Sequence, residues 1–167
     1  GWASAGIAGS PGRYARTHGI DAVRRATRAT NDAVDEIGRV VVAEGIDCAF
    51  RKQGTLTVAT SEPQHARLLA AHEGARSNGT HNDDDQLLTA DGVARHARVA
   101  GTIAGAFTPH CAGVDPARLT RGLAEACERH GVHIYEQTAV LDLHPGHVHT
   151  EHGLVRADVV LRATESY

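Results

Sequence analysis

A helix with strong start and stop signals near residue 120 is the feature that most constrains this chain. Asp115 can cap a helix N-terminus, Pro116 has the fixed φ and missing N–H that suit the first helical position, and Gly131 can end the helix in a left-handed conformation. These signals predict a helix over residues 116–130. Apolar residues at i, i+4, i+7 and i+8 form its buried face: Leu119, Leu123, Ala126 and Cys127.

Strand patterns follow this helix to the end of the chain. Short runs rich in β-branched residues alternate with Pro-Gly and His-Gly breaks, which are typical of turns. The predicted strands cover residues 132–136, 138–143, 147–151, 153–157 and 158–164. The expected order is therefore helix, strand, three-stranded meander and last strand.

The first 45 residues favour helices. A short helical turn is predicted over residues 10–17, and a long helix over residues 21–44 with Gly45 as its stop. Gly38 inside this helix suggests a point of close packing. The predicted buried face carries Val23, Val34, Ile37 and Val41, and Thr27 and Thr30 continue it weakly.

Strand periodicity replaces helical periodicity after residue 47. Residues 48–51 and 54–60 alternate as strands do, around a predicted hairpin turn or bulge at residues 52–54. A third helix begins after Ser61, and its residues expected to point inward are Leu68 and Leu69.

A polar stretch at residues 76–86 follows the third helix. His81 and the acids at 83–85 supply possible cation ligands, but adjacent acids repel and lack the spacing of a calcium loop, so we expect a solvated loop. A short helix at 88–97 and a strand at 101–110 then lead back to the helix described first.

Charge and cysteine content exclude several functions. The net charge is −3, Lys52 is the only lysine, and the arginines are scattered among acids, so nucleic acid is not an expected partner. The apolar runs are too short to span a bilayer and no leader pattern is present, which predicts a soluble protein. Three cysteines without C-x-x-C spacing, Cys48, Cys111 and Cys127, indicate reduced thiols in the cytoplasm.

Four segments together resemble one known family. The run FTPHCAGVDPARLTRGLAEACERHGVHIYEQTAV and the run GLVRADVVLRATESY are similar to flavoprotein oxidoreductases of the D-amino-acid oxidase (DAO) superfamily. The first two runs are most similar to the branch of this superfamily that includes gamma-glutamylputrescine oxidase. The opening GWASAG and the segment GIDCAFRKQGTLTVAT are similar to the same branch. The resemblance therefore extends over most of the chain.

The resemblance implies an α/β fold of mixed α+β type: part of a Rossmann-like FAD-binding domain with a β-meander, interrupted by a substrate-lobe sheet. Residues 1–45 would form the flavin-facing loop and long helix of the FAD domain. Residues 46–110 would form the substrate-binding lobe. Residues 111–167 would form the second part of the FAD domain.

The activity implied for the parent protein is oxidation of a C–N bond in a small-molecule amine or amino acid, with hydride transfer to FAD. The family's G-x-G-x-x-G turn, which holds the pyrophosphate, does not occur in this sequence, and there is no methionine. We therefore expect an internal fragment of a longer protein that is inactive alone. No catalytic residue is named, because in the family the residue that clamps a substrate carboxylate usually comes from later in the chain.

Cofactor contacts implied by the resemblance fall in three places. The opening residues Gly1, Trp2, Ala3 and Ser4 match a loop beside the isoalloxazine ring. Thr138 and Val140 match the strand start near the adenine, and Ala163 and Thr164 match a turn beside the pyrophosphate, where Glu165 replaces the commoner glycine. His110 is the candidate for the substrate pocket, although a structural histidine is at least as compatible with the sequence.

Two other classes of function stay open. The chain could be a non-catalytic module that binds a partner through an exposed sheet edge. It could also be a histidine-rich metal-binding protein, since His147 and His149 share a strand face, although no further ligand is fixed beside them and we assign no metal. A Cys111 nucleophile with His110 as base is disfavoured because neighbours on a strand point to opposite faces, so Cys111 is expected to be a small buried residue.

Overall fold

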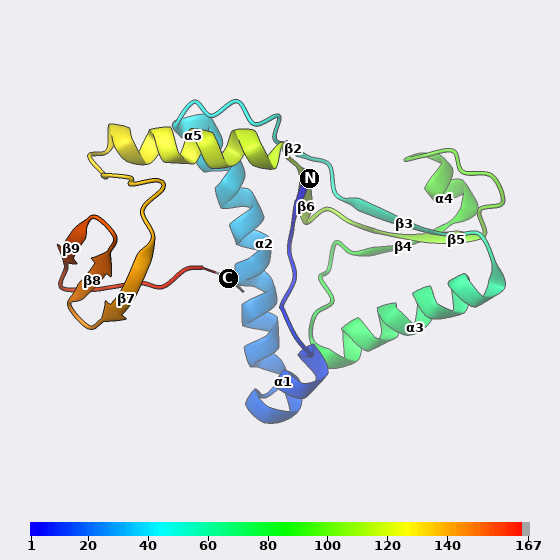
Figure 1. Cartoon of the computed structure of the whole chain (residues 1–167). Helices are drawn as coiled ribbons and strands as arrows, with labels where there is room; N and C mark the ends of the chain where they lie inside the picture. The colour runs from blue at the N-terminus through cyan, green and yellow to red at the C-terminus, as the bar shows by residue number, and fades with distance from the viewer. Residues whose placement is uncertain (165–167) are drawn as a thin grey trace. The chain divides into compact units, whose positions relative to one another are not determined.

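The computed structural model describes residues 1–164, and it divides the chain into two compact units (Figure 1). The first unit comprises Gly1–Ala126 and the second begins at Cys127. Each unit is described by itself below.

A small antiparallel sheet holds the start of the chain in the first unit. Its strand order is β1-β6-β2, with Ser4 opposite Cys111 and Lys52 opposite Ala112. The segment expected to be a loop at Gly1–Ser4 is thus largely a strand, because β6 offers its backbone groups to it. The strands are β1 (Trp2–Ser4), β2 (Arg51–Lys52) and β6 (Cys111–Gly113).

Two helices follow β1: α1 (Pro11–His18) and α2 (Ile20–Ala43). Their positions confirm the predicted turn and long helix. The buried face of α2 carries Val23, Thr27, Asn31, Val34 and Val41. Gly38 is a point of close packing, as its sequence position suggested, because a Cβ there would lie 2.8 Å from the ring of Phe50. An ion pair between Lys52 and Asp35 joins β2 to this helix.

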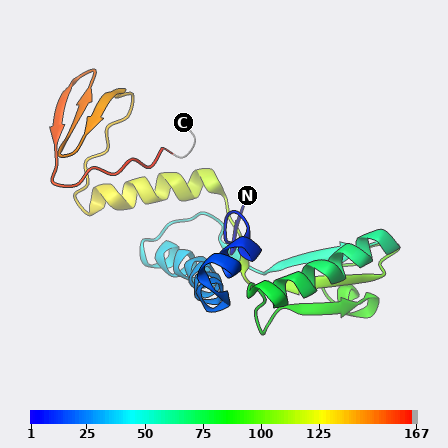
Figure 2. The same cartoon turned by 90° about the horizontal axis from the view of Figure 1, so that it is seen from below.

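A second antiparallel sheet, with strand order β3-β5-β4, lies between two helices (Figures 1 and 2). Helices α3 and α4 lie on opposite faces of the sheet. Val93 of α4 is fully buried, with a methyl group beside Gly105 of the central strand. The elements are β3 (Thr55–Ala59), α3 (Glu62–Asn78), β4 (Gln86–Thr89), α4 (Ala90–Ala94) and β5 (Ala104–Thr108).

Local predictions for this region are partly wrong. Segment 52–54 was predicted as a hairpin turn or bulge, and it is not a hairpin turn, because β2 pairs with β6 while β3 pairs with β5. Between the pairs Lys52–Ala112 and Thr55–Thr108, residues 53–54 lie opposite residues 109–111, an irregularity of the kind a bulge makes, and Gly54 donates its N–H to the Cys111 carbonyl there. Leu69 is 45% exposed while Leu68 is buried, since neighbours on a helix lie about 100° apart. Strand β4 was not predicted, because its residues had been assigned to a loop and a helix.

Helix α5 (Pro116–Arg129) confirms the helix at 116–130. Asp115 caps it by accepting a hydrogen bond of 3.0 Å from the backbone N–H of Arg118. This bond is the main reason that the pKa of Asp115 lies below its ordinary value of 3.8. Its predicted buried face is only partly buried, because Ala126 is buried whereas Leu123 is 39% exposed and Cys127 is exposed.

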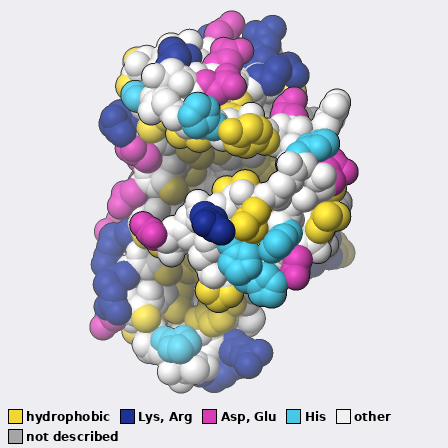
Figure 3. Space-filling view, turned by 60° about the vertical axis from the view of Figure 1, so that its left-hand side comes forward, with side chains coloured by type: hydrophobic (Ala, Val, Ile, Leu, Met, Phe, Trp, Pro, Cys, Tyr) yellow, Lys and Arg dark blue, Asp and Glu magenta, His cyan; other side chains and the backbone are white. Residues whose placement is uncertain are grey.

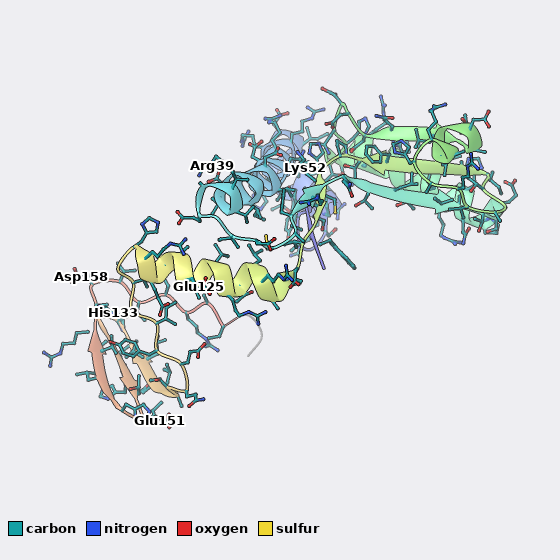
Figure 4. The ribbon with its side chains drawn as sticks, turned by 90° about the horizontal axis from the view of Figure 1, so that it is seen from above. Arg39, Lys52, Glu125, His133, Glu151 and Asp158 are labelled. Atoms are coloured by element: carbon teal, nitrogen blue, oxygen red, sulfur yellow. The ribbon has the colours of Figure 1, made fainter. Side chains whose placement is uncertain are left out.

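The second unit contains the predicted meander, with strand order β7-β8-β9. Its strands are β7 (Val140–His144), β8 (His147–Thr150) and β9 (Gly153–Arg156). The strands predicted at 132–136 and 158–164 are wrong, because both segments are coil; Figure 4 labels His133 and Asp158 in them. A strand needs a neighbour for its N–H and C=O groups, and within residues 1–164 the ladders give these segments none.

The architecture confirms the predicted mixed α/β class, with three small antiparallel sheets and five helices among the described residues. None of the helices in the described part of the chain has the length and apolar character needed to cross a membrane.

Candidate functional site

His110 lies where the two sheets of the first unit meet, between β5 and β6. Its carbonyl accepts the N–H of Ala5 at 3.0 Å, which ties it to the segment after β1. Its Nε2 lies 2.9 Å from a carboxylate oxygen of Asp84, and its side chain is 14% exposed. A carboxylate at this distance favours a hydrogen on Nε2, which leaves Nδ1 as an acceptor in the neutral ring.

Two hollows adjoin His110. The larger has a volume of about 730 Å³, and Arg24, Arg28 and Asp84 stand at its edge. The smaller, of about 100 Å³, lies against Ala5, Gly6 and Ile7. Four residues line both hollows and form what we call the His110 site: Thr27, Asn31, Asn82 and His110.

The loop opposite His110 is held in place by side-chain amides. Asn31 of α2 donates to Asn82 at 2.7 Å, and Asn82 donates its backbone and side-chain N–H groups to Asp85 at 2.9 and 3.1 Å. The side chains of His81 and Asp85 are only 19% and 20% exposed. The expectation of a solvated loop is therefore wrong for these residues, because distant Asn31 anchors the loop to the long helix.

Three buried polar atoms lack a hydrogen-bond partner among the described residues: Thr27 Oγ1, Asp85 Oδ1 and His110 Nδ1. An uncompensated buried polar atom costs about 1–3 kcal/mol, so native proteins contain few of them. All three belong to residues on or facing the 79–85 loop. This clustering marks the region as one where a bound group could complete the hydrogen bonding.

Sequence reasoning found His110 but missed Thr27, Asn31, Asn82 and Asp84. A usable signal existed for two of them. Thr27 and Asn31 occupy the i+4 and i+8 positions after Val23 on the buried stripe of α2, where apolar residues are expected. Polar residues on such a stripe need partners, and here the partner is the 79–85 loop or a ligand.

The residues matched to the isoalloxazine loop lie in and around β1. Trp2 is 77% exposed, whereas Ala3 is half-buried and Ser4 stands opposite Cys111. The strand leads directly into Ala5 and Gly6, which line the smaller hollow. Small residues thus bring the backbone to the edge of the His110 site, as a flat ligand would require.

The remaining matched residues lie in the second unit. Val140 starts β7 opposite Thr150 and is 57% exposed, and the Thr138 hydroxyl bonds to the Glu136 carbonyl at 2.9 Å. Ala163 and Thr164 are exposed coil, with Arg162 donating to the Thr164 hydroxyl at 3.2 Å. Glu165 lies outside the described residues.

Histidines of the meander gather on its surface, and Figure 3 shows a group of such side chains. The rings of His147 and His149 are 5.3 Å apart, and His144 stacks on His147 at 4.9 Å. His144 also bonds to Asp142 at 2.8 Å, which is the main reason that the pKa of Asp142 lies below its ordinary value of 3.8. Within residues 1–164, no three metal-ligating side chains are arranged to hold an ion.

The two buried cysteines occupy structural positions. Cys111 is 7% exposed and Cys48 is 1% exposed, which confirms Cys111 as a small buried residue. Neither cysteine lines a hollow at the His110 site.

The chain is similar to several solved structures. Glycine oxidase from Bacillus cereus is 23% identical, with 92% of this chain and 41% of that chain covered at a TM-score of 0.59. Glycine oxidase from Geobacillus kaustophilus is 21% identical, with 95% and 42% covered at a TM-score of 0.61. L-proline dehydrogenase from P. horikoshii is 19% identical, with 83% and 38% covered at a TM-score of 0.65.

At these identities the similarity shows the fold, and it confirms the predicted fold class. The chain spans about two fifths of the length of the two glycine oxidases, at 41% and 42%. Comparison with curated protein sequences gives no significant match.

The family follows from the sequence model that matches the whole chain. Residues 1–167 match the DAO model, described as FAD dependent oxidoreductase, and the chain belongs to this family. The family predicted from the four sequence segments is thereby confirmed.

The residues present fit the isoalloxazine side of FAD better than its pyrophosphate side. Ala5 and Gly6 have small side chains or none, and they line the same hollow as Thr27 and His110, each of which has an unpartnered polar atom. This combination suits a flat ring with polar edges. No G-x-G-x-x-G turn is present in the sequence to hold the phosphates.

Proposed function

We propose that this chain belongs to a flavin-dependent oxidoreductase that oxidises a C–N bond of a small amine or amino acid. The observation that carries the proposal is the match of residues 1–167 to the FAD dependent oxidoreductase family. Structural neighbours named glycine oxidase, L-proline dehydrogenase and L-amino acid deaminase support oxidation beside nitrogen. The gamma-glutamylputrescine oxidase branch is the finer proposal, and it rests on the sequence resemblance.

The proposed domain division assigns residues 1–45 and 111–167 to the FAD domain and residues 46–110 to the substrate lobe. The sheet β3-β5-β4 with its two helices supports the lobe as a layer of its own. His110 then lies at the return from lobe to FAD domain, which is where a substrate group should meet the flavin.

FAD, when bound, supplies the two-electron acceptor for the substrate C–H bond. The residues of this chain would position the reactants. Asp84 holds the His110 ring through Nε2, and in the neutral ring Nδ1 is an acceptor. Nδ1 is closed to solvent, so the residues around it must move before it can receive an N–H group from the substrate or the cofactor. Thr27 Oγ1 offers a second polar contact, and Ala5 and Gly6 let the ring approach closely.

The first experiment compares the visible spectrum of the purified chain after mixing with FAD and gel filtration with that of the complete gene product. We expect flavin bands near ~450 nm in the complete protein and none retained by the chain alone, because the phosphate-binding turn supplies most of the binding energy. Retention of FAD by the chain alone would show that its binding energy lies elsewhere. Absence of FAD from both proteins would refute the proposed function.

A matched pair of variants in the complete protein tests His110. His110→Gln can keep a donor near Asp84 but loses the Nδ1 acceptor, whereas His110→Asn places its amide near the Nδ1 position and loses the Asp84 contact. If Nδ1 binds substrate, His110→Gln should lower kcat/KM about tenfold or more, with a smaller loss in His110→Asn. Equal values for His110→Gln and the unmodified protein would remove His110 from the site.

A further inference from the structure

A third hollow lies between α3 and the sheet β3-β5-β4, and we call it the α3 hollow. Its volume is about 340 Å³, within the size range of small-molecule sites. Thr55 and Thr57 line it from the sheet, and Leu68, Ala71 and Ala75 line it from the helix. The hollow opens to solvent, with exposed Ala71 among its lining residues, so a small ligand can enter it.

One end of the α3 hollow is polar. His72 and His81 meet edge to face with ring centroids 4.8 Å apart, and His81 Nδ1 lies 3.8 Å from Asp85 Oδ2. Asn82 fixes Asp85 through the same Oδ2, which leaves Oδ1 without a partner among the described residues. Leu68 and Ala71 of α3 are among the apolar residues of the lining.

The lining of the α3 hollow carries negative charge from one side chain. Asp85 is the acidic residue among the described residues that line the hollow, and neither lysine nor arginine is among them. His81 lies beside Asp85 and can carry a positive charge, but it balances Asp85 only when it is protonated. With a neutral His81, the partly buried carboxylate attracts a cation and repels a carboxylate-bearing ligand.

We propose that the α3 hollow binds an alkylammonium ion, with its nitrogen at Asp85 and its chain along Leu68 and Ala71. The ammonium donates the charge-assisted hydrogen bond that Oδ1 lacks. Oδ1 is closed to solvent, so the carboxylate must turn toward the hollow on binding. The terminal torsion of aspartate is soft, but the turn strains the two hydrogen bonds from Asn82 to Oδ2, and the bond from the ammonium has to offset that cost. The imidazole faces of His72 and His81 complete the polar end.

This inference does not depend on the flavin. Asp85 and His72 line the α3 hollow and neither of the two hollows beside His110. The site therefore belongs to the first unit and can be tested on the chain as it stands, without FAD.

The experiment is an NMR titration of the ¹⁵N-labelled 167-residue chain with n-butylammonium chloride at about pH 8, where histidine side chains are in general neutral. We expect saturable shifts at the residues that line the α3 hollow. Butan-1-ol, which lacks the charge, should bind at least about tenfold more weakly, and butyrate should not bind. Absence of saturable shifts, or equal affinity for the alcohol, would overturn the proposal.

Three variants test the site itself. Asp85→Asn keeps an acceptor for Asn82 but removes the charge, so butylammonium should bind about tenfold more weakly. Asp83→Asn removes the same charge two residues away, from a side chain that lines the larger His110 hollow, and should leave affinity unchanged. Ala71→Phe fills the hollow from an exposed helix position and should abolish binding without unfolding the chain.

The pattern across these variants decides the question. Equal weakening by Asp85→Asn and Asp83→Asn would show general surface electrostatics and overturn the site. Unchanged binding in Ala71→Phe would also overturn it, because the ligand would then lie elsewhere.

Discussion

Replacing Thr27 by valine should stabilise the isolated chain. Thr27 is 8% exposed, and its hydroxyl has no partner among the described residues. Valine has nearly the same shape and the same β-branching, so core packing and helix propensity change little. Removing a buried hydroxyl that lacks a partner recovers a desolvation cost of about 1–3 kcal/mol. We expect the free energy of unfolding to rise by at least about 1 kcal/mol, and Tm by about 2–4 °C.

Thr30 provides the matched control on the same helix. Its hydroxyl donates to the Thr27 carbonyl at 2.8 Å, so Thr30→Val loses a hydrogen bond and should lower the free energy of unfolding by about 0.5–1 kcal/mol. Urea denaturation followed by circular dichroism measures both variants. If Thr27→Val destabilises the chain as Thr30→Val does, the Thr27 hydroxyl has a partner and the argument for an incomplete site fails.

Three further substitutions test the framework around the site. Gly54→Ala should cost more than about 2 kcal/mol, because φ is +79° and the new Cβ would lie 2.4 Å from the Thr108 carbonyl oxygen, and thermal unfolding would show it. Val93→Ala, at a position that is 0% exposed, should lower the free energy of unfolding by about 2 kcal/mol in urea. The hydrogen bond from the Arg118 N–H depresses the pKa of Asp115 in the folded chain. The capping contribution of Asp115 is therefore present above pH 3.8 and is lost as the pH falls through the lower folded pKa. Asp115→Ala should reduce helicity at neutral pH and make little difference in strong acid.

The helices were predictable because their signals are local. Asp115 with Pro116 fixes the start of α5, and Gly131, with φ of +84°, follows its last turn as expected. The meander was predictable for the same reason, since turn residues separate its β-rich runs. Family membership was also evident, because its motifs are distributed over four segments of the chain.

The errors arose where structure depends on distant partners. Residues 132–136 have a strand composition, but composition cannot supply a neighbouring strand. Trp2–Ser4 forms a strand only because Cys111–Gly113, more than a hundred residues later, pairs with it. The 79–85 loop looked solvated because the bond from Asn31 to Asn82 joins residues 51 positions apart.

The candidate site was half predictable by the same reasoning. His110 was found through the family resemblance, whereas Asp84, its partner, was interpreted as one acid in a solvated run. Thr27 was noted only as a weak continuation of an apolar face. The structure places Thr27 opposite the 79–85 loop, where Asp85 Oδ1 also lacks a partner, and this position makes Thr27 part of the candidate site.

The concentration of uncompensated polar atoms in one place is itself an argument for function. At about 1–3 kcal/mol each, the three unpartnered atoms together approach the total stability of an ordinary domain, about 5–15 kcal/mol. Scattered at random, such costs would fall on unrelated parts of the fold; here they surround one loop with hollows on both sides. Proteins retain local instability of this kind where a ligand or a reaction needs it. The unliganded protein already bears the desolvation cost of these polar atoms, so a ligand that completes their hydrogen bonds binds more tightly. Thr27→Val should therefore raise the free energy of unfolding and weaken ligand binding.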